Sequence, residues 1–233
     1  MRVLLSVMPL IVLAACSPAG SATGSTTRSF NATGFDAVRV AGSDSVKIVR
    51  GPVTSVTVRG PADQIDRLDI RTDGSVLTVA RKSSSGMNWS GGSVVVTVTM
   101  PTIRAADVSG SGDVSIDRAD GALFEGRVSG SADLDITDIR AASTKLRVVG
   151  SGNLSARGET RALSADVAGS GDLDVKDLIA DTVSIAVTGS GDATAFARQS
   201  ATIAVSGSGN ATVKGTRQCA ISKKGSGEAR CTG

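Results

Sequence analysis

A tetrapeptide of the form Gly-Ser-Gly-Asp recurs along the second half of the chain at a nearly constant interval. The seven copies have as their leading glycines Gly110, Gly130, Gly150, Gly169, Gly189, Gly207 and Gly225. The steps between them are 20, 20, 19, 20, 18 and 18 residues, and a fainter copy begins at Val40. A fixed period near 20 residues is typical of repeat proteins, whose units stack in one dimension.

Each repeat carries two short runs in which apolar and polar residues alternate. In the fourth copy Leu163, Ala165 and Val167 precede the glycines, and Leu173 and Val175 follow them. Alternation with a period of two indicates half-buried strands, and the glycines between the runs allow positive φ and a sharp turn. One coil cannot bury its own apolar face, whereas stacked coils can. The sequence therefore predicts an all-β fold, a β-solenoid with coils of ~20 residues in a rod roughly 30 Å long.

The composition limits the chemistry that this chain can perform. It contains 28 glycines, few aromatic residues, and no histidine or tyrosine. The lack of histidine excludes catalytic triads and metal sites built on that residue. The glycine-rich turns join strand to strand, whereas a phosphate cradle needs a following helix. The net charge is only +3, with Lys and Arg scattered, which argues against nucleic-acid binding. We expect a protein without catalytic activity, cofactor or nucleic-acid partner.

The N-terminal stretch "MRVLLSVMPLIVLAAC" has the pattern of a secretory signal peptide. Arg2 is followed by an apolar run that is too short to span a membrane. Its last four residues, Leu13 to Cys16, resemble a bacterial lipobox, which implies cleavage after residue 15, lipidation of Cys16 and a membrane partner through that lipid. Ser17 resembles the signal for sorting to the outer membrane. The alternative is an ordinary signal peptide with a chance cysteine.

Further along, composition divides the chain into segments. Residues 16–29 are rich in Gly, Ser and Thr and are predicted to form a flexible tether. The solenoid domain is predicted over 30–217, less regular in 30–107 and regular in 108–217, with a C-terminal cap over 218–233. Asp73-Gly74 between two alternating runs predicts a hairpin.

Two further cysteines lie in the predicted cap. Cys219 and Cys231 are an even pair in an exported chain, which suggests a disulfide that staples the end of the solenoid. The alternative is two free thiols.

Several segments together resemble one protein family. They are "FDAVRVAGSDSVKIVRG", "LDIRTDGSVLTVARK" and "VVVTVTMPTIRAADVSGSGDVSI", followed by the recurring GSGD and GSGN. From about Phe30 to Thr216 the chain resembles the bacterial DUF2807 family, also known as the head GIN domain of putative auto-transporter adhesins. The resemblance implies a right-handed parallel β-helix in the cell envelope. It carries over no catalytic residue.

Taken together, these features predict an adhesin-like outer-membrane lipoprotein that faces either the periplasm or the cell surface. The leading alternative is a periplasmic structural or scaffold lipoprotein. A carbohydrate-active β-helix enzyme with paired carboxylates is a weaker alternative.

An acid or an amide follows the glycines in every copy. These residues are Asp113, Asp133, Asn153, Asp172, Asp192, Asn210 and Glu228. Stacking would place them in one column about 4.8 Å apart, where adjacent carboxylates repel by about 1 kcal/mol in water. The favoured role is turn capping, because Asp and Asn tolerate left-handed backbone and can bond to it. The alternative is weak Ca²⁺ binding at the pairs Asp113/Asp133 and Asp172/Asp192.

A second polar column is predicted two residues later. It consists of Ser115, Asp135, Ser155, Asp174, Thr194 and Thr212. We expect these side chains to point outward, where they offer a regular face to a protein or glycan partner or simply a soluble surface. The single tryptophan, Trp89, is the best individual contact candidate, or else it fills a gap in the core. Open solenoid ends also permit oligomers.

Overall fold

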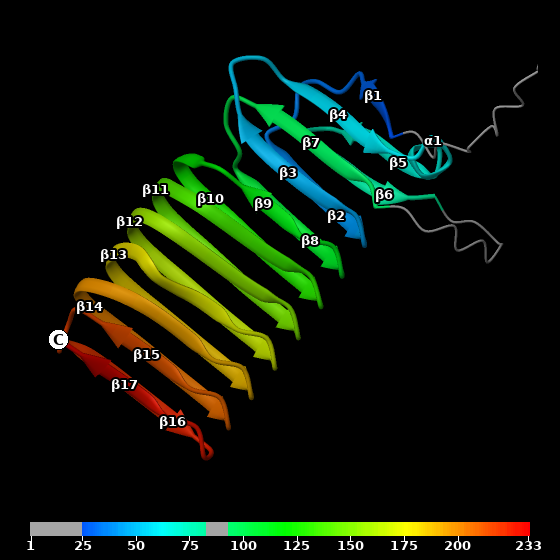
Figure 1. The fold of residues 1–233 in the computed structure, drawn as a ribbon. Coiled ribbons are helices and arrows are strands. Elements are labelled where there is room, and N and C mark those ends of the chain that lie inside the picture. Colours follow the sequence, from blue (N-terminus) through cyan, green and yellow to red (C-terminus); the bar gives the residue numbers. More distant parts are fainter. Residues whose placement is uncertain (1–24, 83–92) are drawn as a thin grey trace, which may run out of the picture.

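The computed structural model describes residues 25–82 and 93–233. It is a right-handed parallel β-solenoid in which strands make up 72% of the described residues and helix 2%. The coils stack along one axis, with the C-terminus at one end and a mixed set of strands at the other (Figure 1). The predicted fold class is therefore confirmed.

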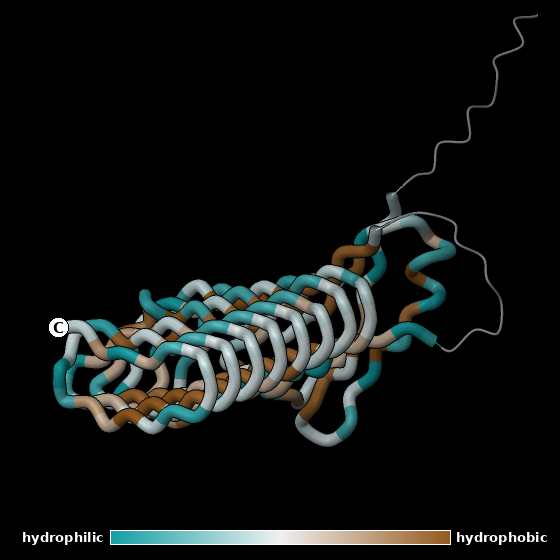
Figure 2. The backbone as a smooth tube through the Cα atoms, turned by 90° about the horizontal axis from the view of Figure 1, so that it is seen from below, coloured by the Kyte–Doolittle hydropathy of each residue, from teal (hydrophilic) through white to brown (hydrophobic). Residues whose placement is uncertain are grey.

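The regular coils run from β8 to the C-terminus. Their strands are β8 (Ala105–Gly110), β9 (Val114–Ile116), β10 (Ala119–Gly130), β11 (Asp133–Gly150), β12 (Asn153–Gly169), β13 (Leu173–Gly189), β14 (Ala193–Gly207), β15 (Ala211–Lys214), β16 (Cys219–Lys224) and β17 (Ala229–Thr232). The long strands β10 to β14 bend from one side of a coil to the next without leaving the ladder. The coils keep one outline along the rod, and apolar segments occupy matching places in successive coils (Figure 2).

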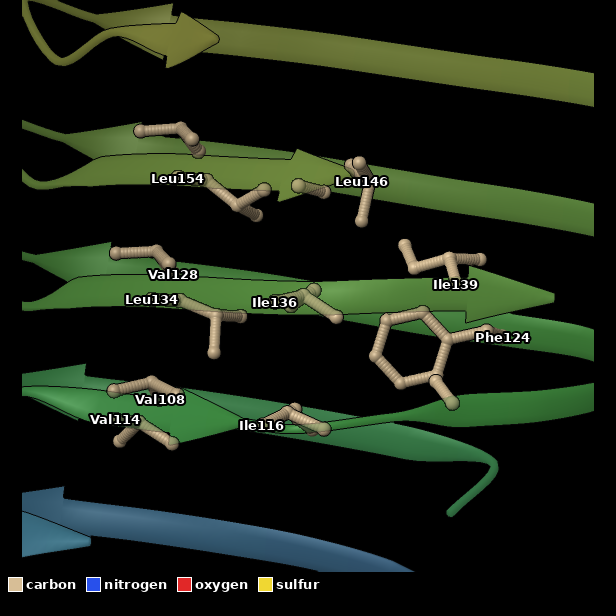
Figure 3. Packing of buried hydrophobic residues seen from close by; sticks show 14 of the residues in the cluster. Val108, Val114, Ile116, Phe124, Val128, Leu134, Ile136, Ile139, Leu146 and Leu154 are labelled. Carbon is tan, nitrogen blue, oxygen red and sulfur yellow. The ribbon is translucent and has the colours of Figure 1, made fainter. Parts of the chain in front are cut away.

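Parallel pairing aligns equivalent residues of neighbouring coils. One inward column consists of Val108, Val128, Val148, Val167, Val187 and Val205, paired one coil apart. Each of these side chains is exposed by 3% or less. Figure 3 shows Val108 and Val128 on one wall, with Val114 and Leu134 on the wall that faces it. Burying one such side chain is worth about 1.5–3 kcal/mol, so the column is a main source of stability.

The Gly-Ser-Gly turns stack as closely as the strands do. The seven leading glycines all have positive φ, between 98° and 135°, as predicted. In every turn except the second, which carries Ala132, a second glycine approaches the coil before it. At Gly171 the backbone N–H donates to the carbonyl of Gly150 at 3.0 Å, and an added Cβ would overlap the carbonyl oxygen of Gly152.

The N-terminal part contains one more coil and an end cover. Its elements are β1 (Thr26–Phe30), β2 (Ala37–Gly42), β3 (Ser45–Arg50), β4 (Ser55–Gly60), α1 (Ala62–Ile65), β5 (Leu68–Asp73), β6 (Val76–Arg81) and β7 (Val95–Met100). Strands β2 and β3 hold the faint repeat copy and stack on β8 and β9. On their other side they pair in parallel with β6 and β7. The chain therefore leaves its first coil, builds the cover, and returns past that coil to continue the stack.

The cover ends in antiparallel strands. Strand β4 pairs with β7 and β1, and β5 pairs with β6. The predicted hairpin at Asp73-Gly74 is confirmed, with Gly74 at φ 57°. Antiparallel strands at this end stop the parallel ladder from continuing, which protects an edge that would otherwise attract other strands.

A partly buried ion pair fastens the cover to the first coil. Asp44 occupies the turn position that a small residue such as Gly112 takes in later coils, and its side chain is only 7% exposed. Arg81 donates to both of its carboxylate oxygens, at 2.8 and 2.5 Å, and also to Gln64 Oε1 at 3.0 Å. The hydrogen bond with Asp44 raises the pKa of Arg81.

The two ends of the domain differ from the predicted segment boundaries. Strand β1 starts at Thr26, inside the segment predicted as a tether, because residues 26–30 pair with β4. At the other end, the segment predicted as a cap continues the register, with β16 on β14 and β17 on β15. A disulfide joins Cys219 to Cys231, with Cα atoms 6.4 Å apart. Both cysteines pack against the core, so the bond links the two walls across the open end.

Candidate binding surfaces

The repeated acids and amides form a hydrogen-bonded ladder along the turns. The side chain of one coil accepts the backbone N–H of the corresponding residue in the next coil. This holds for the pairs Asp133–Asn153, Asn153–Asp172, Asp172–Asp192, Asp192–Asn210 and Asn210–Glu228, at 2.8 to 3.2 Å. Every rung replaces water on an otherwise free N–H group, so these side chains tie coil to coil.

This ladder corrects one part of the turn-capping prediction. Among the described residues, none except glycine has a positive φ, so the Asp and Asn residues do not adopt left-handed backbone. The preceding glycines make the turn, and the side chains cap the neighbouring coil instead of their own. The amides also relieve charge repulsion, since Asn153 and Asn210 each donate a side-chain N–H to the preceding Asp at 3.0 and 2.9 Å.

Of the two acid pairs weighed as Ca²⁺ sites, Asp172/Asp192 is one pair of this ladder, and Asp133 of the other pair is its first member. Asp172 uses one carboxylate oxygen to accept the Asp192 backbone N–H at 2.9 Å, and all four carboxylates of the two pairs are exposed. Across residues 25–82 and 93–233, no group of three or more His, Cys, Asp or Glu side chains is arranged to hold a metal ion. Ca²⁺ favours six to eight oxygen ligands, which two carboxylates alone do not supply.

The six residues of the second polar column do lie in one column. Consecutive members pair in register from Ser115 to Thr212, and the column ends at Arg230 in β17. All six are half-buried, because each leans on its neighbours. Ser155 donates to Asp135, and Thr194 Oγ1 donates to Asp174 Oδ1 at 2.8 Å.

Asp174 is the member of this column whose acidity the structure changes. Burial alone would raise its pKa, but hydrogen bonds from Lys176 and Thr194 outweigh burial and hold the pKa below its usual value. The same contact with Asp174 raises the pKa of Lys176. The ion pair measures 2.5 Å between Lys176 Nζ and Asp174 Oδ2. The column is therefore a surface of charged and hydroxyl groups already bonded to one another.

A recess of about 600 Å³ opens at another corner of the coils, where sequence reasoning placed no site. Small residues, Gly121, Ala141 and Ala142, leave the space. Charged residues line it, namely Asp138, Arg140, Glu159, Arg161, Asp181 and Arg198. Arg140 pairs with Asp138 and Arg198 with Glu159, each at 3.0 Å.

This corner is where the repeat is irregular. The register shifts between Ile136 and Ile139 and again between Val175 and Ile179. The sequence signal that could have indicated this corner is the uneven step of 18 to 20 residues between the leading glycines. A corner whose length varies from coil to coil cannot keep one repeated residue pattern. The recess can hold a small polar group, and its alternating charges suit a ligand that carries both donors and acceptors.

Two predicted site residues fall outside the described part of the chain. These are the lipidation candidate Cys16 and the contact candidate Trp89. Within the described part, no helix is both long and apolar enough to cross a membrane.

Several solved bacterial structures share this fold. A putative adhesin from Bacteroides fragilis superimposes with a TM-score of 0.83 at 22% identity, covering 89% of this chain and 97% of that one. A putative adhesin and a putative lipid binding protein, both from Parabacteroides distasonis, give TM-scores of 0.71 and 0.69 at 18% and 19% identity. Each covers 90% of this chain, over 97% and 96% of its own length. At these identities the likeness shows a shared fold.

The sequence comparisons agree with the structural ones. No curated protein matches the chain in sequence. A family model described as "Putative auto-transporter adhesin, head GIN domain" matches residues 34–216. That match spans most of the 233 residues and includes the elements from β2 to β15, so the chain belongs to the DUF2807 family.

Proposed function

We propose that this protein is a bacterial outer-membrane lipoprotein whose solenoid is a non-catalytic, adhesin-like binding rod. Its family and structural neighbours support an adhesin-like domain at the cell envelope. The lipobox-like Leu13 to Cys16 supports the anchor. The partner is a protein or glycan that contacts the outer columns of the coils.

The observation that carries a non-catalytic role is the ladder of acids and amides. Glycosidases hold two carboxylates opposite one another across the bond that they cleave, about 5–9.5 Å apart. Here the repeated acids lie side by side on the rod surface and accept backbone N–H groups from the next coil. Their regular recurrence follows from coil stacking, so it needs no catalytic explanation.

The chain geometry gives the rod a direction. Residues 17–24 separate Cys16 from the described chain, and eight residues span at most about 30 Å when extended. Strand β1 belongs to the end cover, at the opposite end of the rod from β16 and β17 (Figure 1). A lipid on Cys16 would hold the covered end near the membrane and leave the C-terminal coil farthest from it.

Protease treatment of cells tests this proposal and its alternative. Digestion of the wild-type solenoid on intact cells would favour the adhesin-like role on the surface. Protection until the outer membrane is permeabilised would instead favour a periplasmic scaffold. The anchor is tested with Cys16→Ser, which should move the protein from the membrane fraction to the soluble fraction. An unchanged membrane fraction for this variant would contradict lipidation.

A further inference from the structure

The positive charge of the protein is concentrated in its last coil. From residue 214 onward the chain carries Lys214, Arg217, Lys223, Lys224 and Arg230 against one acid, Glu228. The last coil therefore has a net side-chain charge of +4, whereas the whole chain has +3 and everything before residue 214 sums to −1. Lys and Arg are scattered along the rod, as the sequence indicates, but they are concentrated in the last coil.

Most cations elsewhere on the described rod have acidic partners, although some, such as Lys47 and Arg147, do not. Arg140 pairs with Asp138 at 3.0 Å, and Lys145 pairs with Glu125 at 3.3 Å. The last coil differs. Across residues 25–82 and 93–233, no carboxylate pairs with Lys223 or Lys224. The one ion pair of this coil, between Arg230 and Glu228, is long at 3.7 Å and exposed.

Lys223 has an unusual position. It pairs in register with Val205, so it stands in the inward column that every earlier coil fills with valine. Among the described strands none stacks on the far side of β16, and the Lys223 side chain is exposed. Lys224 is exposed beside it, and Arg230 lies in β17, on the other wall of the same coil. The cations therefore surround the open end of the solenoid instead of lying along one side.

We propose that this terminal coil is a binding site for an anionic glycan, in which the lysine ammonium groups and the Arg230 guanidinium neutralise carboxylate groups along the polymer. Lys223 and Lys224 can bind such a chain without first breaking an internal ion pair, and the ion pair that Arg230 must give up is long and exposed. A linear polymer can follow charges that lie on both walls, and guanidinium groups can bind carboxylates through two hydrogen bonds.

An anionic membrane is the less suitable partner. Within the last coil, Ile221 is the one large apolar side chain that is strongly exposed, at 48%. Stable membrane attachment needs more buried apolar area than one such residue supplies. The orientation also rests on the proposed anchor, which would place this coil farthest from the cell's own membrane.

The test uses the purified full-length lipoprotein in non-ionic detergent, with polygalacturonate as the probe and neutral dextran as the comparison. We expect the wild type to bind polygalacturonate, to ignore dextran, and to lose affinity steeply as salt is added. Lys223→Gln combined with Lys224→Gln should weaken binding roughly 30-fold at low salt, from a contribution of about fivefold per cation. The control, Lys47→Gln with Arg147→Gln, removes two exposed cations from the sides of the rod and should change affinity less than about threefold.

Three results would overturn the proposal. These are no binding by the wild type at low salt, an equal loss in the control, and binding to phosphatidylglycerol vesicles but not to polygalacturonate. Edge-strand lysines also prevent association, so sedimentation must show that the double variant is monomeric. If it associates, Arg230→Gln provides the same test at the other wall. Because purified protein is used, the outcome does not depend on the anchor or on the side of the membrane that the domain faces.

Discussion

Replacing Gly171 by alanine tests whether the turns need glycine for close stacking of the coils, separately from the need for positive φ. Gly171 is the second glycine of its turn and does not have a positive φ, unlike Gly169 before it. An alanine Cβ at this position would lie 3.0 Å from Val148 Cγ1 and 3.1 Å from the Gly152 carbonyl carbon, and would overlap the Gly152 oxygen. The cost therefore comes from contact with the neighbouring coil.

The structure contains a natural version of this change. The second of the seven regular turns carries Ala132, which is fully buried, where the turns before and after it carry Gly112 and Gly152. Gly152 and Gly171 each donate a backbone N–H to the leading glycine of the coil before, at 2.9 and 3.0 Å. Within the described chain, the N–H of Ala132 makes no such bond. The methyl group is accommodated by moving the turn and losing one hydrogen bond.

These observations set the expected magnitude for Gly171→Ala. The lost hydrogen bond costs about 0.5–1.5 kcal/mol, and forcing a methyl group into a filled space costs about 1–3 kcal/mol. We expect the free energy of unfolding to fall by about 2–4 kcal/mol, measured by urea denaturation followed by far-ultraviolet circular dichroism. Ser170→Ala, an exposed change in the same turn, should stay within about 0.5 kcal/mol. A loss below about 1 kcal/mol for Gly171→Ala would show that the turns do not need glycine for close stacking.

Three further changes test other parts of the fold. Arg81→Met should lower the free energy of unfolding by about 2–3 kcal/mol, because it leaves the buried Asp44 carboxylate unpaired. Backbone amides of the end cover should then exchange hydrogen faster than those of the coils, and equally fast exchange in all coils would contradict this. Cys231→Ser should cost about 3 kcal/mol in urea denaturation, from the loop closed between Cys219 and Cys231, and reduction of the wild type should reproduce the loss. The pKa of Asp174 is lower in the folded state than in the unfolded state. Its contribution to the free energy of unfolding is therefore fully present above the ordinary pKa near 4, and it is lost as the pH falls through the lower pKa of the folded state. The stability difference between the wild type and Asp174→Asn should accordingly shrink below pH ~4, and a difference that grows there would refute the assignment.

The sequence predicted the regular coils because each feature of a coil repeats. The valines before Gly169 and Gly189 alternate with polar residues, and stacking requires that they align, so the walls and the positive φ of the leading glycines follow directly. The end cover could not be predicted in this way. Strands β6 and β7 pair with β2 and β3, although β4, α1 and β5 lie between them in the sequence. No repeated motif indicates this pairing. The pairing of β1 with β4 was not predicted either, because residues 26–30 have the composition of a linker.

The ladder of acids and amides was predicted from the sequence as a capping column, but the backbone groups that it caps are not the ones expected. Asp and Asn after a glycine suggest left-handed backbone when one turn is considered alone. In a stack, the nearest free N–H belongs to the next coil, one repeat later, and the side chain of Asp133 bonds there to Asn153 at 3.0 Å. The recess escaped prediction because its corner lacks a repeat, so Arg161 and Arg198 could not be assigned to one surface from their spacing.

Stacking also indicates where function can vary in this fold. The inward column keeps valine from Val108 to Val205 because each methyl group fills the space left by the coil before it. The outward column beside it has no such constraint, and it changes from Arg127 to Asp166 to Ala204 across the same coils. A position whose neighbours determine its residue type cannot adapt to a ligand without loss of stability. Recognition should therefore lie where stacking constrains the residue type least, at the irregular corner and at the last described coil, where Lys223 stands in the valine column and no described strand covers it.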